Sequence, residues 1–465
     1  MNEKHNLLAE EVRSQIKSFY LAKKPAKIYH GGTNSTRPFD FKKGEVVDVS
    51  KLNNVLEINS EERYALVESN VSMRKLVEAT LKYNLIPPVV MEFSEITVGG
   101  GIQGGAGESS SFKWGLFHNI CMEYEIILGD GEMIKVSPEE NVDLFYGTAG
   151  SYGSLGVITT VKIKLIPAKK FVELSYYPVY NFSIAAELIK NYSVDREVEY
   201  LDGIMFSENS GVIMTGKLTD QKNLPISKFL RAQDDWFYLH AKKIIKNNEP
   251  RKEIIPIRDY LFRYDRGAFW MGIFSFKILK IHFDKFTRFV FNIFLNTKTL
   301  YRSLHATNLS GRYIIQDFCL PFEKAPEFFK FSNDDLKIYP IWLCPLKTDN
   351  QAKLLPTHLN DSTCLNVGIY GEPKNKSDIV KLSQDLENKA KSLSGRKWFY
   401  AHTYYFREEF WQIYDLPWYT ELRKKYSAET VFPDIYDKVH VKEKIQASIT
   451  KGIFRFLKSP FKLNN

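Results

Sequence analysis

Three glycine-rich segments in the first third of the chain place backbone amides where they could bind a ligand. They read YHGGTNST at 29–36, TVGGGIQGGAGESSS at 97–111 and GTAGSYGSLGV at 147–157. Glycine permits positive φ and lets the backbone approach a ligand closely, and successive amides in such turns form concave anion sites. A cofactor that carries a diphosphate would explain all three segments together, whereas ordinary surface turns would explain each one separately.

The second segment also contains the spacing GxGxxG, at Gly99, Gly101 and Gly104. In dinucleotide-binding βαβ units this pattern follows a strand and opens a helix. Here it continues as GAGESSSFKWG, whose glycines and serines do not favour the start of a helix. The sequence therefore argues against a Rossmann fold.

Regular elements are predicted around these segments by hydrophobic periodicity. Two alternating runs at 122–136 flank Gly129-Asp130-Gly131, which predicts a β-hairpin. Ser72 is a candidate cap for a helix over 71–83. Further helices are predicted at 6–20, 378–393 and 441–458, and strands at 46–49, 64–68 and 159–167.

Length and composition predict more than one domain. The chain has 465 residues, more than one ordinary core organises, and glycine is concentrated before residue 172. We therefore expect domains at 1–171 and 172–440, followed by a basic amphipathic tail at 441–465. The aromatic, Lys/Arg-rich stretch at 269–302 and this tail fit a protein that rests on an anionic membrane, although the tail fits equally a helix that packs on the body.

Charge and cysteine content narrow the class further. The formal net charge of +9 favours an anionic partner, yet no nucleic-acid-binding motif is present. The four cysteines lack CxxC spacing, so we expect neither a metal cluster nor a disulfide framework, which fits a reducing compartment. No apolar run reaches the roughly 18–20 residues that span a bilayer, and the N-terminus is unlike a signal peptide. The expected location is cytoplasmic, with peripheral attachment to the cytoplasmic membrane face as an alternative.

The order of the three segments resembles the FAD-binding domain of the vanillyl-alcohol oxidase and p-cresol methylhydroxylase (PCMH) superfamily. The resemblance implies an α+β fold, with a PCMH-type FAD-binding domain of two α/β subdomains and a C-terminal α+β substrate domain. The residues that it implies for FAD binding are His30, Gly31, Gly32, Thr33, Asn34, Ser35, Thr97, Gly99, Gly100, Gly104, Gly105, Glu108, Ser109, Ser110, Ser111, Gly150, Gly153, Gly156, Val157 and Ile158.

Longer motifs resemble one branch, the 24-dehydrocholesterol reductase (Diminuto) family. In the first half these are TVGGGIQGGAGESSSFKWGLFHNICMEYEIILGDG and SPEENVDLFYGTAGSYGSLGVITTVKIKLIPAKKFVEL. In the second half, IYPIWLCPL, VGIYGEP, REEFWQIYDLPWYTELRKKY and FPDIYDKV are also similar to that family. The resemblance implies reduction of a C=C bond in a sterol-like or isoprenoid lipid, with NADPH as electron donor.

The sequence also departs from the family. Animal and plant members carry an N-terminal membrane segment, whereas here the flavin-domain motifs begin almost at once, so we expect no such segment. Asn34 occupies the position where some relatives in the superfamily attach flavin through histidine, and 85–96 lack the cysteine that others use. Non-covalent FAD is therefore expected.

Reduction of an unactivated alkene by hydride needs a nearby acid to protonate the second carbon. The catalytic candidates are Tyr370 and Glu372 in GIYGEP, and Tyr404 and Arg407 in TYYFREEFW, with His402 as a further candidate. For each of them a structural hydrogen bond or ion pair is the more common explanation. Two alternatives stay open: an oxidase or dehydrogenase of an alcohol or lipid-linked sugar, and a membrane-surface flavin-binding protein without catalysis.

Overall fold

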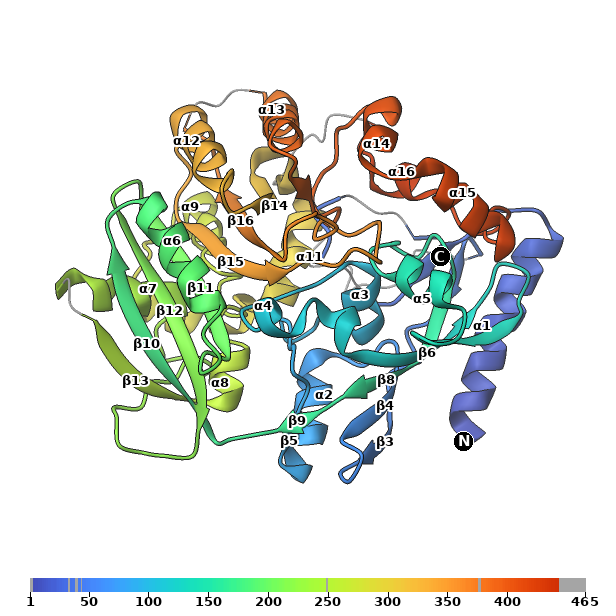
Figure 1. The fold of residues 1–465 in the computed structure, drawn as a ribbon, viewed down its shortest axis with the longest axis horizontal. Coiled ribbons are helices and arrows are strands. Elements are labelled where there is room, and N and C mark those ends of the chain that lie inside the picture. Colours follow the sequence, from blue (N-terminus) through green and yellow to red (C-terminus); the bar gives the residue numbers. More distant parts are fainter. Residues whose placement is uncertain are drawn as a thin grey trace.

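The computed structural model describes residues 3–31, 34–37, 41–42, 44–247, 250–374 and 378–442. Its mixture of helices and two large sheets confirms the predicted α+β class (Figure 1). Gly32 and Thr33, and all of the expected tail beyond residue 442, lie outside the described residues.

The first sheet lies in the N-terminal third and is antiparallel throughout. Its strand order is β3 (Val55–Asn59), β4 (Tyr64–Glu68), β8 (Val157–Lys164), β6 (Cys121–Ile127) and β7 (Met133–Val136). Strands β6 and β7 form the predicted hairpin around Gly131 at φ +88°. A Rossmann fold requires a parallel sheet, so this sheet confirms the argument against one.

A smaller layer adjoins this sheet. Strands β1 (Lys27–Tyr29) and β2 (Val46–Asp48) pair in parallel, and β5 (Leu85–Ile86) pairs with β9 (Ile166–Pro167). Helix α1 (Glu3–Leu21) confirms the prediction at 6–20. Helix α2 (Met73–Thr80) begins after Ser72, whose side chain accepts a hydrogen bond from Lys75 N at 3.3 Å.

The second glycine segment contains a helix that the sequence did not predict. Helix α3 (Val98–Gln103) begins inside the segment and is capped by Thr97, whose Oγ1 accepts from Gly100 N at 3.2 Å. Burial of Val98 and Ile102 in the core outweighs the low helix propensity of three glycines. A second short helix, α4 (Ser111–Trp114), follows the serine run.

The second sheet has eight strands, all drawn from residues 171–397. Its order is β13 (Arg251–Pro256), β10 (Phe171–Val179), β12 (Ser210–Thr219), β11 (Tyr200–Ser207), β15 (Ile341–Lys347), β16 (Thr363–Gly371), β14 (Ile314–Pro321) and β17 (Arg396–Lys397). Helices α6 (Phe182–Ser193), α12 (Ala325–Asp335) and α13 (Ile379–Ser392) cover one face (Figure 1).

Strand alternation divides the side chains of β14, β15 and β16 between the two faces of this sheet. Phe318, Leu343 and Val367 pack in the hydrophobic cluster beneath the covering helices. Their neighbours in sequence therefore point to the opposite face, where the cavity described below lies. These neighbours are Asp317, Trp342 and Asn366, and Tyr370 shares their face.

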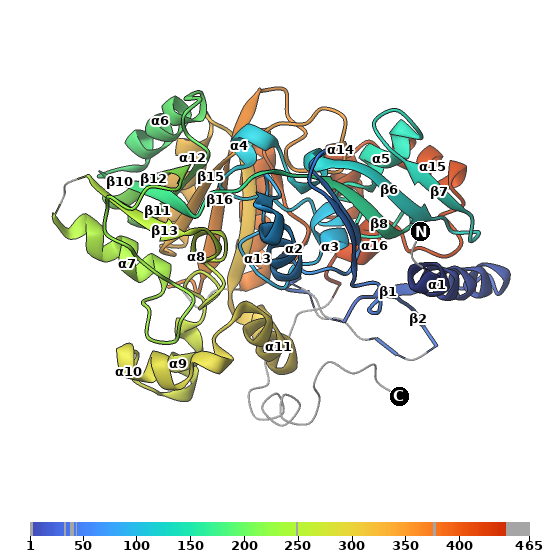
Figure 2. The same cartoon turned by 90° about the horizontal axis from the view of Figure 1, so that it is seen from below.

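Five of the remaining helices lie beside the second sheet, and the last three lie beside the first sheet. Helices α7 (Phe237–Ile244), α8 (Ile257–Leu261), α9 (Ile273–Leu279), α10 (Lys285–Val290) and α11 (Thr297–Thr307) lie along one side of the molecule in Figure 2. Helices α14 (Arg407–Ile413), α15 (Leu416–Lys425) and α16 (Ile435–Val439) lie beside the first sheet, where α15 contacts α5 (Val142–Thr148). Short 3-10 helices complete these elements: η1 (Leu81–Tyr83), η2 (Phe117–Ile120), η3 (Ile245–Asn247), η4 (Asn292–Phe294) and η5 (Leu309–Arg312).

The cysteines correct one expectation. Cys319 on β14 and Cys364 on β16 form a disulfide, with Cα atoms 6.1 Å apart, whereas the sequence predicted none. The two residues are 45 positions apart, so their spacing gave no signal, and only the pairing of β14 with β16 brings them together. Among the described residues, no helix is long and apolar enough to cross a membrane, and no side-chain cluster could hold a metal ion.

Candidate cofactor and substrate site

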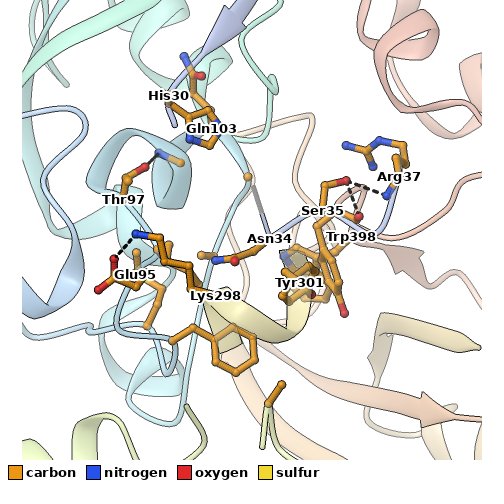
Figure 3. Close-up of a pocket in the computed structure, with 18 of the residues that line it drawn as sticks. His30, Asn34, Ser35, Arg37, Glu95, Thr97, Gln103, Lys298, Tyr301 and Trp398 are labelled. Atoms are coloured by element: carbon orange, nitrogen blue, oxygen red, sulfur yellow. Dashed lines mark hydrogen bonds and ion pairs between the residues drawn. The ribbon is translucent and has the colours of Figure 1, made fainter. Parts of the chain in front are cut away.

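All three glycine-rich segments contribute to a single cavity of about 960 Å³. One end is lined by the first segment, by α3 and by the start of β8, and the other end by residues of the second half. Figure 3 shows this arrangement, with Asn34 and Thr97 from the first half and Lys298, Tyr301 and Trp398 from the second. Of the residues that the sequence predicted to bind FAD, those that line the cavity are His30, Gly31, Asn34, Ser35, Thr97, Gly99, Gly100, Gly104, Val157 and Ile158.

The first segment follows β1 and is tied to the second half of the chain. Gly31 has φ +87°, a conformation that favours glycine. Ser35 Oγ donates to the Tyr400 carbonyl at 2.9 Å, and an Arg37 guanidinium N–H donates to the Ala401 carbonyl at 3.1 Å. Burial lowers the pKa of His30 to about 4, so this lining imidazole is neutral.

The third glycine-rich segment is hydrogen-bonded to the second. Its Gly150, Gly153 and Gly156 do not line the cavity, but Tyr152 N donates to the Gln103 carbonyl at 3.0 Å and Gln103 Nε2 donates to the Gly156 carbonyl at 3.1 Å. Gly153 has φ +74°, and a Cβ there would lie 2.6 Å from Ile28 Cδ1. This glycine therefore allows β1, α3 and the third segment to approach one another closely.

Two cations beside these loops provide the test of whether a diphosphate fits. Arg37 and Lys438 line the cavity, and within the described parts of the chain both donate to backbone carbonyls, not to carboxylates; Lys438 Nζ donates to Gly153 at 3.1 Å. Burial, together with the charges of Arg423 and Arg37, lowers the pKa of Lys438 to about 7. Positive charges held this close together fit the diphosphate of FAD, which they would neutralise.

Four consecutive residues that the sequence predicted to bind FAD, Glu108 to Ser111, do not line the cavity. Glu108 and the three serines that follow it are buried, and Ser109 Oγ donates to Glu108 Oε2 at 2.7 Å. Ser110 Oγ donates to the Pro88 carbonyl at 2.7 Å and also contacts the Glu108 carboxylate. These bonds hold the loop after α3, so this group positions cavity-lining backbone without facing the ligand. Gly105 likewise does not line the cavity.

The second end of the cavity is apolar and aromatic, with a buried acid among the rings. Asp317 accepts hydrogen bonds from Tyr370 Oη at 2.8 and 2.9 Å, from Tyr400 Oη at 2.5 Å and from Asn366 Nδ2 at 2.7 Å. Burial raises the pKa of Asp317 in spite of these bonds. The apolar lining includes Phe269, Met271, Phe274, Ile278, Leu304, Tyr313, Ile315 and Trp342.

Glu92 is a lining residue that sequence reasoning missed. It is buried, and its Oε1 has no hydrogen-bond partner among the described residues. Burial, with the charge of Glu108 nearby, raises the pKa of Glu92 well above its usual range, which favours the protonated form of this carboxyl. The available signal was an acid inside the apolar run IPPVVMEF, where an exposed carboxylate is not expected.

Of the four catalytic candidates, only Tyr370 lines the cavity. Glu372 pairs with Arg312 at 3.1 Å, and neither residue lines the cavity. Arg407 is exposed, and its guanidinium contacts Asp434 and Asp437 at 3.4 Å each. These two charged candidates therefore form surface ion pairs.

The other two candidates are buried without lining the cavity. Tyr404 lies beside Glu387, to whose carboxylate its backbone N–H donates at 3.1 Å. His402, the further candidate, has its Nε2 2.9 Å from the Thr36 carbonyl. Both residues therefore have structural roles in this region.

Comparison with known proteins agrees with this geometry. Residues 9–137 match the family model described as FAD binding domain. That match and the cavity define the chain as a flavoprotein, an FAD-dependent oxidoreductase.

Relatives that match over most of their length identify the family. The chain is 32% identical over 415 residues to Delta(24)-sterol reductase of Macaca fascicularis and equally to that of Homo sapiens, covering 88% of this chain and 80% of each relative. It is 28% identical to Delta(24)-sterol reductase of Arabidopsis thaliana, over 86% of this chain and 78% of that protein. The chain belongs to the Delta(24)-sterol reductase family, as the sequence motifs predicted.

Proposed function

We propose that this flavoprotein reduces a C=C bond of a sterol-like or isoprenoid lipid, with electrons that NADPH delivers through non-covalently bound FAD. The observation that carries the proposal is one cavity that joins glycine-rich loops and two basic side chains to an aromatic end, with the buried carboxyl of Glu92 in its lining. The names of the relatives agree with this reaction class. Peripheral attachment to the cytoplasmic membrane face is part of the proposal.

The reaction adds one hydride and one proton across the double bond. Reduced FAD, when bound, supplies the hydride to one alkene carbon. The other carbon needs a proton from a group that stays protonated in an apolar site and yet is more acidic than water. The protein must therefore provide a neutral acid that faces the cavity.

Glu92 is the proposed proton donor. It lines the cavity, burial raises its pKa well above the usual range and so favours the protonated form, and its Oε1 has no competing partner among the described residues. Tyr370 is a weaker acid, because burial and Asp317 raise the pKa of its hydroxyl well above the usual value. Tyr370, Tyr400 and Asn366 instead fix Asp317 and shape the polar edge of the aromatic end.

The cofactor is proposed to be held without a covalent bond. Asn34 lines the cavity in the first segment, and a carboxamide cannot form the flavin linkage that a histidine forms. Arg37 and Lys438 would neutralise the diphosphate. The backbone that would lie closest to the cofactor is that of Gly31, Gly99 and Gly100.

Anaerobic titration of the purified yellow protein with NADPH, and separately with NADH, tests the proposal. Bleaching of the flavin by NADPH, followed by reoxidation when a desmosterol-like or polyprenyl lipid is added, is the expected result. Mass spectrometry of the lipid should show a gain of two hydrogens. Flavin that is reduced by an alcohol and not by either nicotinamide would overturn the proposal in favour of an alcohol oxidase or dehydrogenase.

A further inference from the structure

A cluster of exposed apolar side chains lies on α10 and the adjoining ends of α9 and η4. Six of the seventeen large hydrophobic residues that are exposed in the described chain fall within 279–294, including Phe286 at 73% and Ile293 at 70%. Scattered exposed apolar residues are ordinary, whereas clusters mark interaction sites. We call this cluster the α9–α10 patch: Leu279, Phe286, Phe289, Val290, Ile293 and Phe294.

The spacing within α10 places three members of the patch on one side of that helix. Phe286, Phe289 and Val290 stand at i, i+3 and i+4, and Ile293 and Phe294 follow on η4. The opposite side faces the protein, where Arg288 is buried and donates to Asp235 at 2.9 Å. The helix is therefore fixed to the body with its apolar face outward.

The rim of the patch is basic. Between 277 and 298 the chain carries five Lys or Arg residues and a single acid, Asp284. Asp284 caps α10, because its Oδ1 accepts from Thr287 N at 2.9 Å. Lys277, Lys280 and Lys285, which lie next to patch residues or within a few positions of them in sequence, are exposed. An apolar centre with a cationic rim is complementary to a bilayer that contains anionic lipids.

The patch adjoins the aromatic end of the cavity. Helix α9 lines the cavity with Phe274 and Ile278, while the next residue, Leu279, belongs to the patch. Lys298, at the start of α11, is exposed and also lines the cavity, so the cavity reaches the surface there. Figure 2 shows α9 and α10 projecting at the edge of the molecule, close to α11.

We propose that the α9–α10 patch docks onto an anionic lipid bilayer, and that a lipid substrate enters the cavity from the bilayer beside α9. The entry route rests on the proposed lipid substrate, whereas the docking does not. Other occupants fit the charge less well. Residues 443–465 carry five basic residues and one acid, and a second copy of this patch would also bring like charges together.

Flotation of the full-length protein with vesicles of phosphatidylglycerol and phosphatidylcholine tests the docking. Wild-type protein should float with these vesicles, less at high salt and less with phosphatidylcholine alone, because the basic rim contributes. A patch variant should lose at least ~10-fold in its ratio of bound to free protein. A control variant with three exposed apolar residues replaced elsewhere should bind like wild type. The patch variant is Phe286→Ser, Phe289→Ser, Ile293→Ser, and the control is Ile184→Ser, Val194→Ser, Ile226→Ser.

A second measurement uses a substitution that leaves the patch apolar. Tryptophan emission of Phe286→Trp should be quenched additionally by brominated lipids, whereas that of Val194→Trp, also highly exposed, should not. Equal flotation of the patch and control variants would overturn the proposal. So would loss of flotation on Ile449→Ser, Ile453→Ser, Phe456→Ser with the patch variant still bound, or a patch variant that alters only self-association.

The entry route has its own readout. The patch variant should reduce a detergent-solubilised lipid at the wild-type rate but a vesicle-embedded lipid at least ~10-fold more slowly. Unchanged turnover of the vesicle-embedded lipid would overturn the entry route. Failure of the proposed function would instead appear as absent turnover of both lipids by wild-type protein, with vesicle binding intact.

Discussion

Burial of a charged carboxylate costs free energy, so the structure must compensate each acid that lines the cavity or keep it protonated. Asp317 has three hydrogen-bond donors that stabilise it, whereas Glu92 Oε1 has none among the described residues. The raised pKa of Glu92 favours the protonated carboxyl, whose proton is then available to a ligand. This difference between two neighbouring acids is what separates a proton donor from a positioning group.

Replacing Glu92 by glutamine removes the proton and nearly preserves the shape of the side chain. We expect Glu92→Gln to slow lipid reduction by ~10²–10⁴-fold, the usual contribution of a general acid, while NADPH still bleaches the flavin at a near wild-type rate. Stopped-flow spectroscopy separates the two half-reactions. In the wild type, lipid reduction should fall as the pH rises through the raised pKa of Glu92, because only the protonated form is active.

Glu372→Gln is the matched comparison, since Glu372 was an equally strong candidate on sequence grounds. Its carboxylate pairs with Arg312 outside the cavity, so the rate should stay within about 2-fold of wild type. A large loss in Glu372→Gln with normal turnover in Glu92→Gln would reverse the two assignments.

Lys438 should make the affinity for FAD depend on pH. Its pKa is about 7 without an anion nearby, and a bound diphosphate would raise it. Affinity should therefore be level below pH 7 and fall above it, because binding then requires uptake of a proton. Lys438→Met should weaken binding at pH 6 and flatten the profile from pH 7 to 9, as measured by flavin fluorescence. Lys24→Met, at an exposed lysine, should keep the wild-type profile.

The sequence could predict the loops at this scale but not the acid. Glycines such as Gly31 and Gly153 report a backbone requirement through their own residue type. The importance of Glu92 depends on the distant segments that bury it, and those are not local in sequence. Glu372 and Arg407 drew attention through motif membership alone, and the structure pairs both with charged neighbours outside the cavity.

At the scale of elements, α1 is fastened to the first sheet by a buried charged contact. His5 Nδ1 lies 2.9 Å from Glu68 Oε1 on β4, and Nε2 lies 3.5 Å from Glu125 Oε1 on β6. Hydrogen bonds to Glu125 and Glu68 raise the pKa of His5 to about 9. The imidazolium thus links α1 to two strands of the FAD-binding domain.

This contact predicts a stability that depends on pH. The folded-state pKa of His5 exceeds the unfolded value of about 6.5, so its contribution is complete below pH 6.5 and is lost as the pH rises through 9. We expect His5→Gln to lower the free energy of unfolding by about 3 kcal/mol more at pH 6 than at pH 10. Urea denaturation measures the difference. A gap that is constant over this range would contradict the assignment, and Leu7→Ala, at an exposed position, should show no such trend.

Elements with a local signal were predicted well, and the others were not. The β6–β7 hairpin, α2 with its Ser72 cap, and α13 all follow from periodicity and turn residues within a single segment. Helix α3 was missed because its stability comes from burial of Val98 and Ile102, which outweighs three glycines. The Cys319–Cys364 disulfide was missed because it depends on which strands become neighbours.

At the scale of the whole molecule, a buried network joins the two halves behind the cavity. Arg263 donates to Asp202 at 2.9 Å and to Ser109 Oγ, in the loop after α3, at 3.3 Å. Tyr264 Oη and Trp342 Nε1 also donate to Asp202, at 2.7 and 3.1 Å. One hydrophobic cluster also runs through both sheets. The two halves should therefore unfold together.

Arg263→Met tests this coupling, because it leaves Asp202 buried without its cationic partner. We expect a loss of about 3–5 kcal/mol in the free energy of unfolding, since breaking one side of a buried pair leaves an uncompensated charge. Arg258→Met is the control: its pair with Glu78 is exposed, so the loss should stay below about 1 kcal/mol. Flavin release reports the cavity, and tryptophan emission reports both halves, because Trp114, Trp411 and Trp418 lie on α4, α14 and α15 and the other four tryptophans lie elsewhere in the second half. Both probes should give one coincident transition in wild type and in Arg263→Met, because the shared cluster remains; separate midpoints in the wild type would show that the halves fold independently.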